Sequence, residues 1–150
     1  MSAEAKRIYQ EWLDAVSRDI MGGDVAAVAA RMAYPQTMAT RDGAVRFERP
    51  AQMEAAAAEF GASLRRMGGR ELVRICEEAA FEADGTRIAG RHTSHVLKAG
   101  SYVLPPYASR MWLRLDGETW LGDGIEADML YRDCTIFTPD QLRLSREAGR

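Results

Sequence analysis

Residues 71–131 read ELVRICEEAAFEADGTRIAGRHTSHVLKAGSYVLPPYASRMWLRLDGETWLGDGIEADMLY, and this stretch decides the fold. Turn-forming pairs at 84–85, 99–100 and 116–117 separate four apolar-rich segments at roughly 71–82, 86–98, 102–115 and 119–131. Tight turns between long strands are typical of an antiparallel meander. Because a strand rises about 3.3 Å per residue, strands of this length cannot stay flat over a small core. The sequence therefore predicts a strongly curved sheet whose concave side is filled by helices.

Helical patterns precede these strands. Apolar residues recur every fourth position from Ile8 to Ile20, after a capping Ser2, and predict a first helix that ends at Gly22-Gly23. The remaining predicted elements are a second helix at 25–32, a hairpin at 36–48, a third helix from Pro50 to the glycines at 68–69 and a final helix at 139–148. The fold class that follows is α+β, with three N-terminal helices packed in a mostly antiparallel sheet and a short C-terminal helix.

Composition limits the function classes. The chain has 150 residues, of which 47% are apolar and 28% charged, with a net charge of −2. These values indicate one globular domain over residues 1–150 and no basic field for nucleic acid or an anionic membrane. Cys76 and Cys134 have no metal-ligand spacing, and no cofactor motif is found. No signal peptide or membrane span is recognised, so a cytoplasmic protein without metal or cofactor is expected.

The order of these elements resembles the nuclear transport factor 2-like (NTF2-like) superfamily, in particular its SnoaL-like and ketosteroid-isomerase-like members. The fragments that carry the resemblance are GGDVAAVAARM at 22–32, ATRDGAVRFERP at 39–50 and SRMWLRLDGETW at 109–120. It covers roughly residues 4–131 and leaves 132–150 as a C-terminal extension. The resemblance implies a cone-shaped α+β fold, a pocket between the helices and the concave sheet face, and homodimerisation.

The catalytic pattern of the isomerases does not carry over. Aligned on the second helix, the position of their aspartate base holds Thr40, and their oxyanion-hole positions hold Val16 and Met111. Isomerase chemistry of that kind needs both the base and the oxyanion hole, so it is disfavoured here. The His/Asp pair described for the cyclase-like members cannot be mapped onto specific positions, which leaves cyclase activity open.

Three polar residues are candidate catalytic groups, with alternatives for each. Asp123 shares a strand face with Leu121 and Ile125, where a carboxyl group could act as an acid/base group. The alternative is a structural role, in which a bulge turns it to solvent or an arginine pairs with it. His92 and His95 point to opposite faces of one strand, so at most one reaches a pocket, and joint metal binding is disfavoured. The alternative for either histidine is a hydrogen-bonded sheet residue.

The residues expected to form the apolar walls of the pocket come from several segments. These ligand-binding candidates are Trp12, Phe60, Tyr107 and Met111, together with Tyr34, whose hydroxyl is a candidate ligand contact. On the outer sheet face, Trp112 between Arg110 and Arg114 is either a dimer contact or covered by the C-terminal segment.

Two functions remain open at this stage. One is a pocket for a small, largely apolar molecule, with cofactor-free isomerase, dehydratase or cyclase chemistry. The other is a non-enzymatic dimerisation or interaction module with a vestigial pocket. A void of roughly 300 Å³ lined by Asp123 and a histidine would favour the first, and a filled cone would exclude it.

Overall fold

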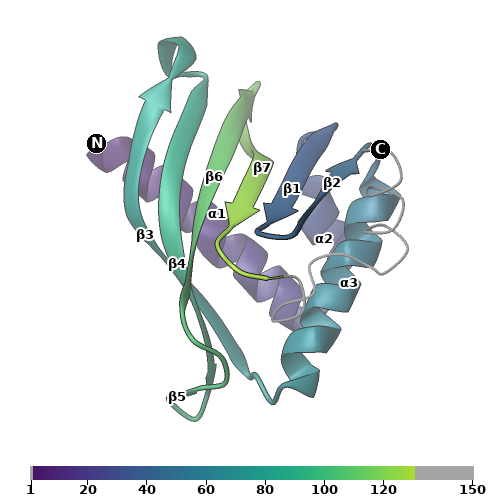
Figure 1. Cartoon of the computed structure of the whole chain (residues 1–150). Coiled ribbons are helices and arrows are strands. Elements are labelled where there is room, and N and C mark those ends of the chain that lie inside the picture. Colours follow the sequence, from purple (N-terminus) through teal and green to yellow (C-terminus); the bar gives the residue numbers. More distant parts are fainter. Residues whose placement is uncertain (1, 131–150) are drawn as a thin grey trace.

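A computed structural model, which describes residues 2–130, consists of helices packed against one curved sheet (Figure 1). Its elements in chain order are α1 (Ala3–Gly22), α2 (Val25–Ala30), β1 (Gln36–Thr40), β2 (Gly43–Phe47), α3 (Pro50–Arg66), β3 (Glu71–Glu82), the 3-10 turn η1 (Ala83–Gly85), β4 (Arg87–Lys98), β5 (Ser101–Tyr102), β6 (Tyr107–Asp116) and β7 (Thr119–Ala127). The predicted α+β class is confirmed. The predicted final helix at 139–148 and the whole C-terminal extension at 132–150 lie outside the described residues.

The sheet contains the predicted meander and extends it. Its strand order is β2-β1-β7-β6-β4-β3, with β5 paired to β4. The four strands β3, β4, β6 and β7 are antiparallel neighbours, whereas β1 joins β7 in parallel and so adds the hairpin to the sheet. The strand predicted at 102–115 is two strands, because Pro105 and Pro106 cannot donate to a ladder and interrupt it.

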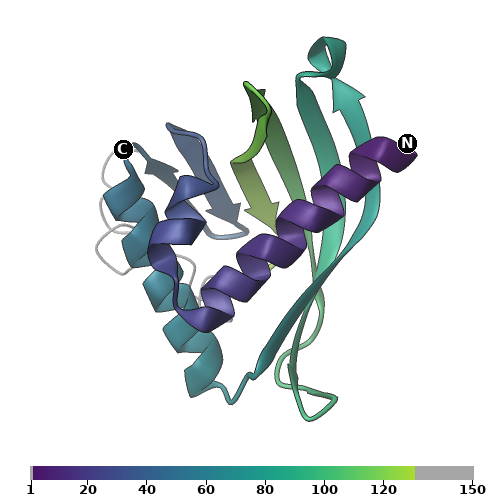
Figure 2. The same ribbon diagram turned by 180° about the vertical axis from the view of Figure 1, so that it is seen from behind.

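Helix α1 covers the concave face of the meander, which it crosses diagonally (Figure 2). The helix begins at Ser2, whose hydroxyl accepts from the Ala5 amide, and ends at the left-handed Gly23. Its buried stripe includes Tyr9, Leu13 and Val16, each at most 1% exposed. A Cβ atom at Gly90 of β4 would lie 2.5 Å from the Tyr9 ring, so this strand position needs glycine for the helix to approach.

Two irregularities in the sheet change which side chains face the helices. The β3–β4 register shifts between Cys76 and Glu78, and the β6–β7 register shifts between Met111 and Leu113. A bulge of this kind sets two residues of one strand against one of its partner and reverses the alternation beyond it. The second bulge decides where the side chain of Asp123 lies.

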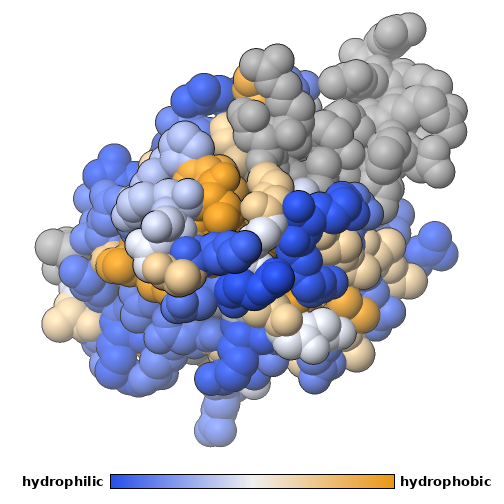
Figure 3. Space-filling view, turned by 90° about the horizontal axis from the view of Figure 1, so that it is seen from below, coloured by the Kyte–Doolittle hydropathy of each residue, from blue (hydrophilic) through white to orange (hydrophobic). Residues whose placement is uncertain are grey.

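The surface seen from below is mainly hydrophilic, with separate hydrophobic patches (Figure 3). Within residues 2–130, the helices are either too short or too polar to serve as a membrane span.

Candidate functional site

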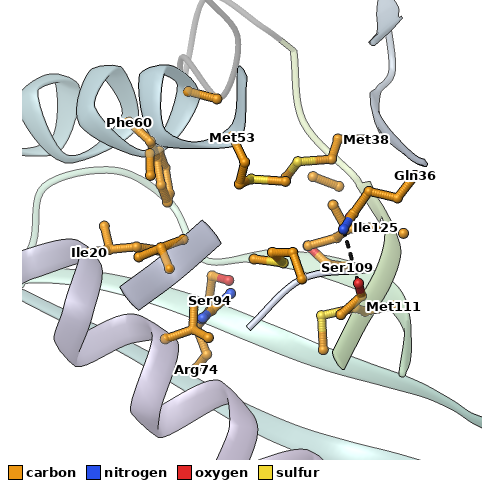
Figure 4. A pocket seen from close by; sticks show the side chains of 18 of the residues that line it. Ile20, Gln36, Met38, Met53, Phe60, Arg74, Ser94, Ser109, Met111 and Ile125 are labelled. Carbon is orange, nitrogen blue, oxygen red and sulfur yellow. Dashed lines mark hydrogen bonds between the residues drawn. The ribbon is translucent and has the colours of Figure 1, made fainter. Parts of the chain in front are cut away.

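A cavity lies where α1, α2 and α3 face the concave side of the sheet (Figure 4). Its walls are mostly apolar, because the inward positions of the helices carry residues such as Val16, Ile20 and Phe60. Four methionines take part: Met32, Met38, Met53 and Met111. Thioether side chains are unbranched and flexible, which lets a wall adapt to the shape of a bound molecule.

The cavity is small. It leaves about 70 Å³ for the centres of water-sized atoms. One water needs about 10–15 Å³ of such space, so the site has room for a few waters or for a compact organic molecule about the size of a single ring. The cone is therefore neither filled by side chains nor as open as the 300 Å³ void considered from the sequence.

His92 of β4 is the buried histidine of this cavity. It is 0% exposed, and its Nδ1 atom lies 2.7 Å from the Tyr9 hydroxyl of α1. Burial first, and the nearby Arg74 cation second, lower the pKa of His92 to about 3. The imidazole is therefore neutral at pH 7. Its other nitrogen, Nε2, is buried and has no hydrogen-bond partner among the described residues.

Arg74 of β3 brings a cation to the same cavity, opposite Phe60 and Met53 of α3 (Figure 4). The residue is 8% exposed, its Nε donates to Ser17 Oγ at 2.7 Å, and its Nη2 donates to the Leu13 carbonyl at 3.2 Å. Burial lowers the pKa of the guanidinium, but arginine keeps its proton in proteins. Helix α1 thus holds the position of a buried positive charge.

Cross-strand pairing gathers further polar side chains beside these two. Ser109 of β6 is the direct partner of His92, and Ser94 of β4 is the partner of both Arg74 and Tyr107. Direct partners on one sheet face have Cβ atoms about 4.5–5.5 Å apart. The Ser109 hydroxyl is buried and, like His92 Nε2, is without a partner in the described part of the chain. A mainly apolar cavity therefore contains one group of polar atoms on the sheet side.

The sequence matches no known protein-family model and no curated protein. Solved structures are similar to it. Aln2 from a Streptomyces species aligns with a TM-score of 0.67 and 17% identity over 86% of this chain and 93% of that one. An NTF2-like protein with a cystatin-like fold from Novosphingobium aromaticivorans aligns with a TM-score of 0.63 and 16% identity over 98% and 90%. The chain has the NTF2-like fold. Rv3472, a protein of unknown function from Mycobacterium tuberculosis, is also similar, with a TM-score of 0.59 and 18% identity over 83% and 72%.

Within this NTF2-like cone, five of the residues singled out from the sequence line the cavity: Trp12, Phe60, His92, Tyr107 and Met111. Val16 and Met111, which align with the oxyanion-hole positions of the isomerases, are both in its wall, whereas Thr40 is not. The cavity thus lies where the resemblance places a pocket, with apolar side chains at those two positions.

Three other candidates lie elsewhere. Asp123 is outside the cavity lining and pairs with Arg87, whose Nη1 is 3.2 Å from the carboxylate, because the bulge at Met111/Leu113 turns it away. His95 packs against Tyr102 at a ring distance of 5.8 Å. The Tyr34 hydroxyl donates to the Ala29 carbonyl at 2.8 Å, and burial raises the pKa of this phenol to about 12.

Arg74, Ser94, Ser109 and Tyr9 were missed by the sequence reasoning. A signal for Arg74 was present: it alternates with Leu72 and Cys76, both buried, so strand parity places it on the concave face. Ser94 has the parity of His92 in the same way. The alternation predicts the face on which each residue lies, but it does not predict which neighbours form hydrogen bonds with an inward-facing polar group.

Proposed function

We propose that the protein binds a small, largely apolar organic molecule in this cavity. The observation that carries the proposal is the pair of buried polar atoms, His92 Nε2 and Ser109 Oγ, that have no partner among the described residues and lie in a mainly apolar enclosure. A buried polar group without a hydrogen bond costs about 1–3 kcal/mol, and a ligand that supplies the bond recovers this cost. Apolar pockets with a few convergent polar groups are typical of small-molecule sites.

A cofactor-free reaction of the isomerase, dehydratase or cyclase type is the chemical extension of this proposal. Of the three sequence candidates, His92 is the one that reaches the cavity. A neutral imidazole can hydrogen-bond to a carbonyl oxygen and stabilise the negative charge that develops there. We assign this role to His92, and Tyr9 then acts as the positioning residue that holds the ring.

Filling the cavity tests the binding proposal. Ala57 of α3 lines the cavity, whereas Ala58 on the same helix is exposed. We expect Ala57→Leu to weaken the binding of compact monocyclic compounds, such as benzyl alcohol and cyclohexanol, by roughly tenfold or more, because the added side chain occupies their space. Thermal shift and calorimetric titration measure the effect, since a ligand at a hundredfold its Kd stabilises by about 2.7 kcal/mol.

Ala58→Leu is the matched control and should bind like the unmodified protein. If no compact compound of a broad panel stabilises the unmodified protein, the pocket is vestigial and the interaction-module alternative replaces this proposal. Equal binding by the Ala57→Leu variant would place the ligand at another site.

We further propose that the protein forms a homodimer through the outer face of the sheet. Val73 and Ile75 of β3 are 39% and 51% exposed, Tyr102 of β5 is 57% exposed, and the Arg110 guanidinium lies 5.8 Å from the Trp112 ring centre. Exposed apolar and aromatic side chains beside arginine are the composition enriched in protein interfaces.

Replacing Ile75 by glutamate should shift the protein from dimer to monomer in sedimentation equilibrium. An interface charge of this kind is buried without a partner and so weakens association. Phe81→Glu is a suitable control, because Phe81 is also exposed but pairs with the buried Ile88 and so projects from the opposite face. A monomeric unmodified protein at micromolar concentration would refute the dimer.

A further inference from the structure

The Arg74 guanidinium is a buried cation that has no ion-pair partner within residues 2–130. Its Nε and Nη2 atoms bond to Ser17 and Leu13, both neutral partners on α1, which leaves Nη1 without a hydrogen bond to any described residue. No carboxylate within residues 2–130 makes an ion pair with it, and Asp14 acts on it only through longer-range attraction. The face of Trp12, 6.0 Å from the guanidinium carbon, supplies the remaining stabilisation.

Such an arrangement is costly in the absence of a ligand. Removing an ion from water costs several kcal/mol even after the surroundings relax, and hydrogen bonds to neutral groups offset only part of it. A neutral ligand that covers Nη1 without accepting a hydrogen bond from it would make the deficit larger. A ligand that carries a negative charge would offset it instead.

Two other polar groups of the cavity, on His92 and Ser109, can also donate to a ligand. The Tyr9 hydroxyl has His92 Nδ1 as its hydrogen-bond partner in the described part of the chain. If Nδ1 carried the proton, the buried phenol hydrogen would be left without an acceptor. The arrangement that satisfies both groups has the phenol donating to Nδ1, and the neutral ring then carries its proton on the unpartnered Nε2. The Ser109 hydroxyl, next to His92 across the strands, can also donate.

We propose that the ligand is a small carboxylate with a compact apolar body, whose head group binds Arg74 Nη1, His92 Nε2–H and the Ser109 hydroxyl. This inference rests on the proposed binding function and names its ligand class. A carboxylate has two oxygens and about four lone-pair sites, so it accepts from all three donors while its single charge balances the single cation. A phosphate monoester carries close to two charges, whereas the described residues that line the cavity include one cationic side chain, Arg74. The apolar body of the ligand would then contact the walls formed by Phe60, Met53 and Ile20 (Figure 4).

Matched pairs of ligands test the proposal on the unmodified protein. Benzoate is compared with benzyl alcohol, and cyclohexanecarboxylate with cyclohexylmethanol, by calorimetric titration at pH 7 and constant ionic strength. We expect each carboxylate to bind roughly tenfold tighter or more, because hydrogen bonds to charged groups contribute about 1.5–3 kcal/mol. The side-chain NMR resonances of Arg74 should shift with the carboxylates and not with the alcohols.

Two variants test whether the preference for carboxylates depends on Arg74. Arg74→Gln should remove the preference for carboxylates and change alcohol binding by less than roughly threefold. The matched control Arg18→Gln, which removes an exposed arginine of α1, should retain the preference. If Arg74→Gln does not fold, the ligand pairs and the Arg74 resonances of the unmodified protein still decide the question.

The outcomes separate the two proposals. Alcohols that bind as tightly as the carboxylates would overturn the carboxylate assignment and leave the binding function standing, with Arg74 holding α1 to the sheet. Carboxylate preference that survives Arg74→Gln would overturn the assignment to this residue. Binding of neither member of any pair would reject the binding function together with its ligand class.

Discussion

Truncating Trp12 to alanine should lower the free energy of unfolding by about 3–5 kcal/mol. The side chain is 7% exposed, and its Nε1 donates to the Arg31 carbonyl at 3.2 Å. It packs so closely on β7 that a Cβ atom at Gly122 would lie 2.6 Å from the ring. Removing the indole therefore loses buried apolar area and leaves a void that the β7 backbone cannot fill. Urea unfolding monitored by far-ultraviolet circular dichroism measures the change.

The Trp12→Ala variant also tests whether Trp12 forms part of the cavity wall. Because Trp12 forms part of the wall, its removal should enlarge the space, and added indole should bind there and recover part of the lost stability. Trp12→Phe is the matched control: it retains a ring, loses the bond to Arg31, and should cost less than the alanine variant. A loss below about 1 kcal/mol for Trp12→Ala would mean that the ring is not packed as described.

Stability should also fall on acidification because of His92. The pKa of its imidazole is about 6.5 in an unfolded chain and about 3 in the folded protein, where burial and the Arg74 cation oppose the charged form. Below pH 6.5 the unfolded state therefore binds a proton that the folded state does not, so the folded state loses relative stability as the pH falls toward 3. Linkage gives a loss of roughly 2–3 kcal/mol from this group between pH 7 and pH 4.5.

A comparison of pH profiles isolates this contribution from that of the carboxylates. His92→Gln removes the titrating group, so its unfolding free energy should vary less with pH than that of the unmodified protein, by roughly 2–3 kcal/mol over this range. Any loss of stability from the substitution itself is constant with pH and does not affect the difference. Parallel profiles for His92→Gln and the unmodified protein would contradict a buried neutral imidazole.

The ligand preference and the acid sensitivity share one structural cause. Strands β3, β4 and β6 place Arg74, His92 and Ser109 side by side on the concave face, under the cover of α1. The burial that keeps the imidazole neutral also removes the guanidinium from most of the solvent that would balance its charge. The proposed carboxylate would supply the missing charge and the missing acceptors together.

Local patterns in the sequence were sufficient to predict most of the fold. The turn pairs at 84–85, 99–100 and 116–117 bound the meander, and the fourfold apolar spacing from Ile8 to Ile20 predicts α1, because turns and helices depend on interactions between residues close in the chain. Strand parity also predicts Met111 on the concave face and Trp112 on the opposite one. In the structure Met111 lines the cavity, and Trp112 lies beside the Arg110 guanidinium. The parallel pairing of β1 with β7 has no such local signal, since it joins segments far apart in the sequence.

The polar part of the cavity depended on tertiary structure. Asp123 stood out by the same alternation that located Met111, but one extra residue at the Met111/Leu113 bulge reverses its direction and brings it to Arg87. A bulge is set by packing across the sheet, which no periodicity in a single strand records. Arg74 and His92 have the right parity in the sequence. Only the approach of α1 decides which of their atoms remain unpaired among the described residues, because Tyr9 bonds to one ring nitrogen and Ser17 and Leu13 bond to two guanidinium nitrogens.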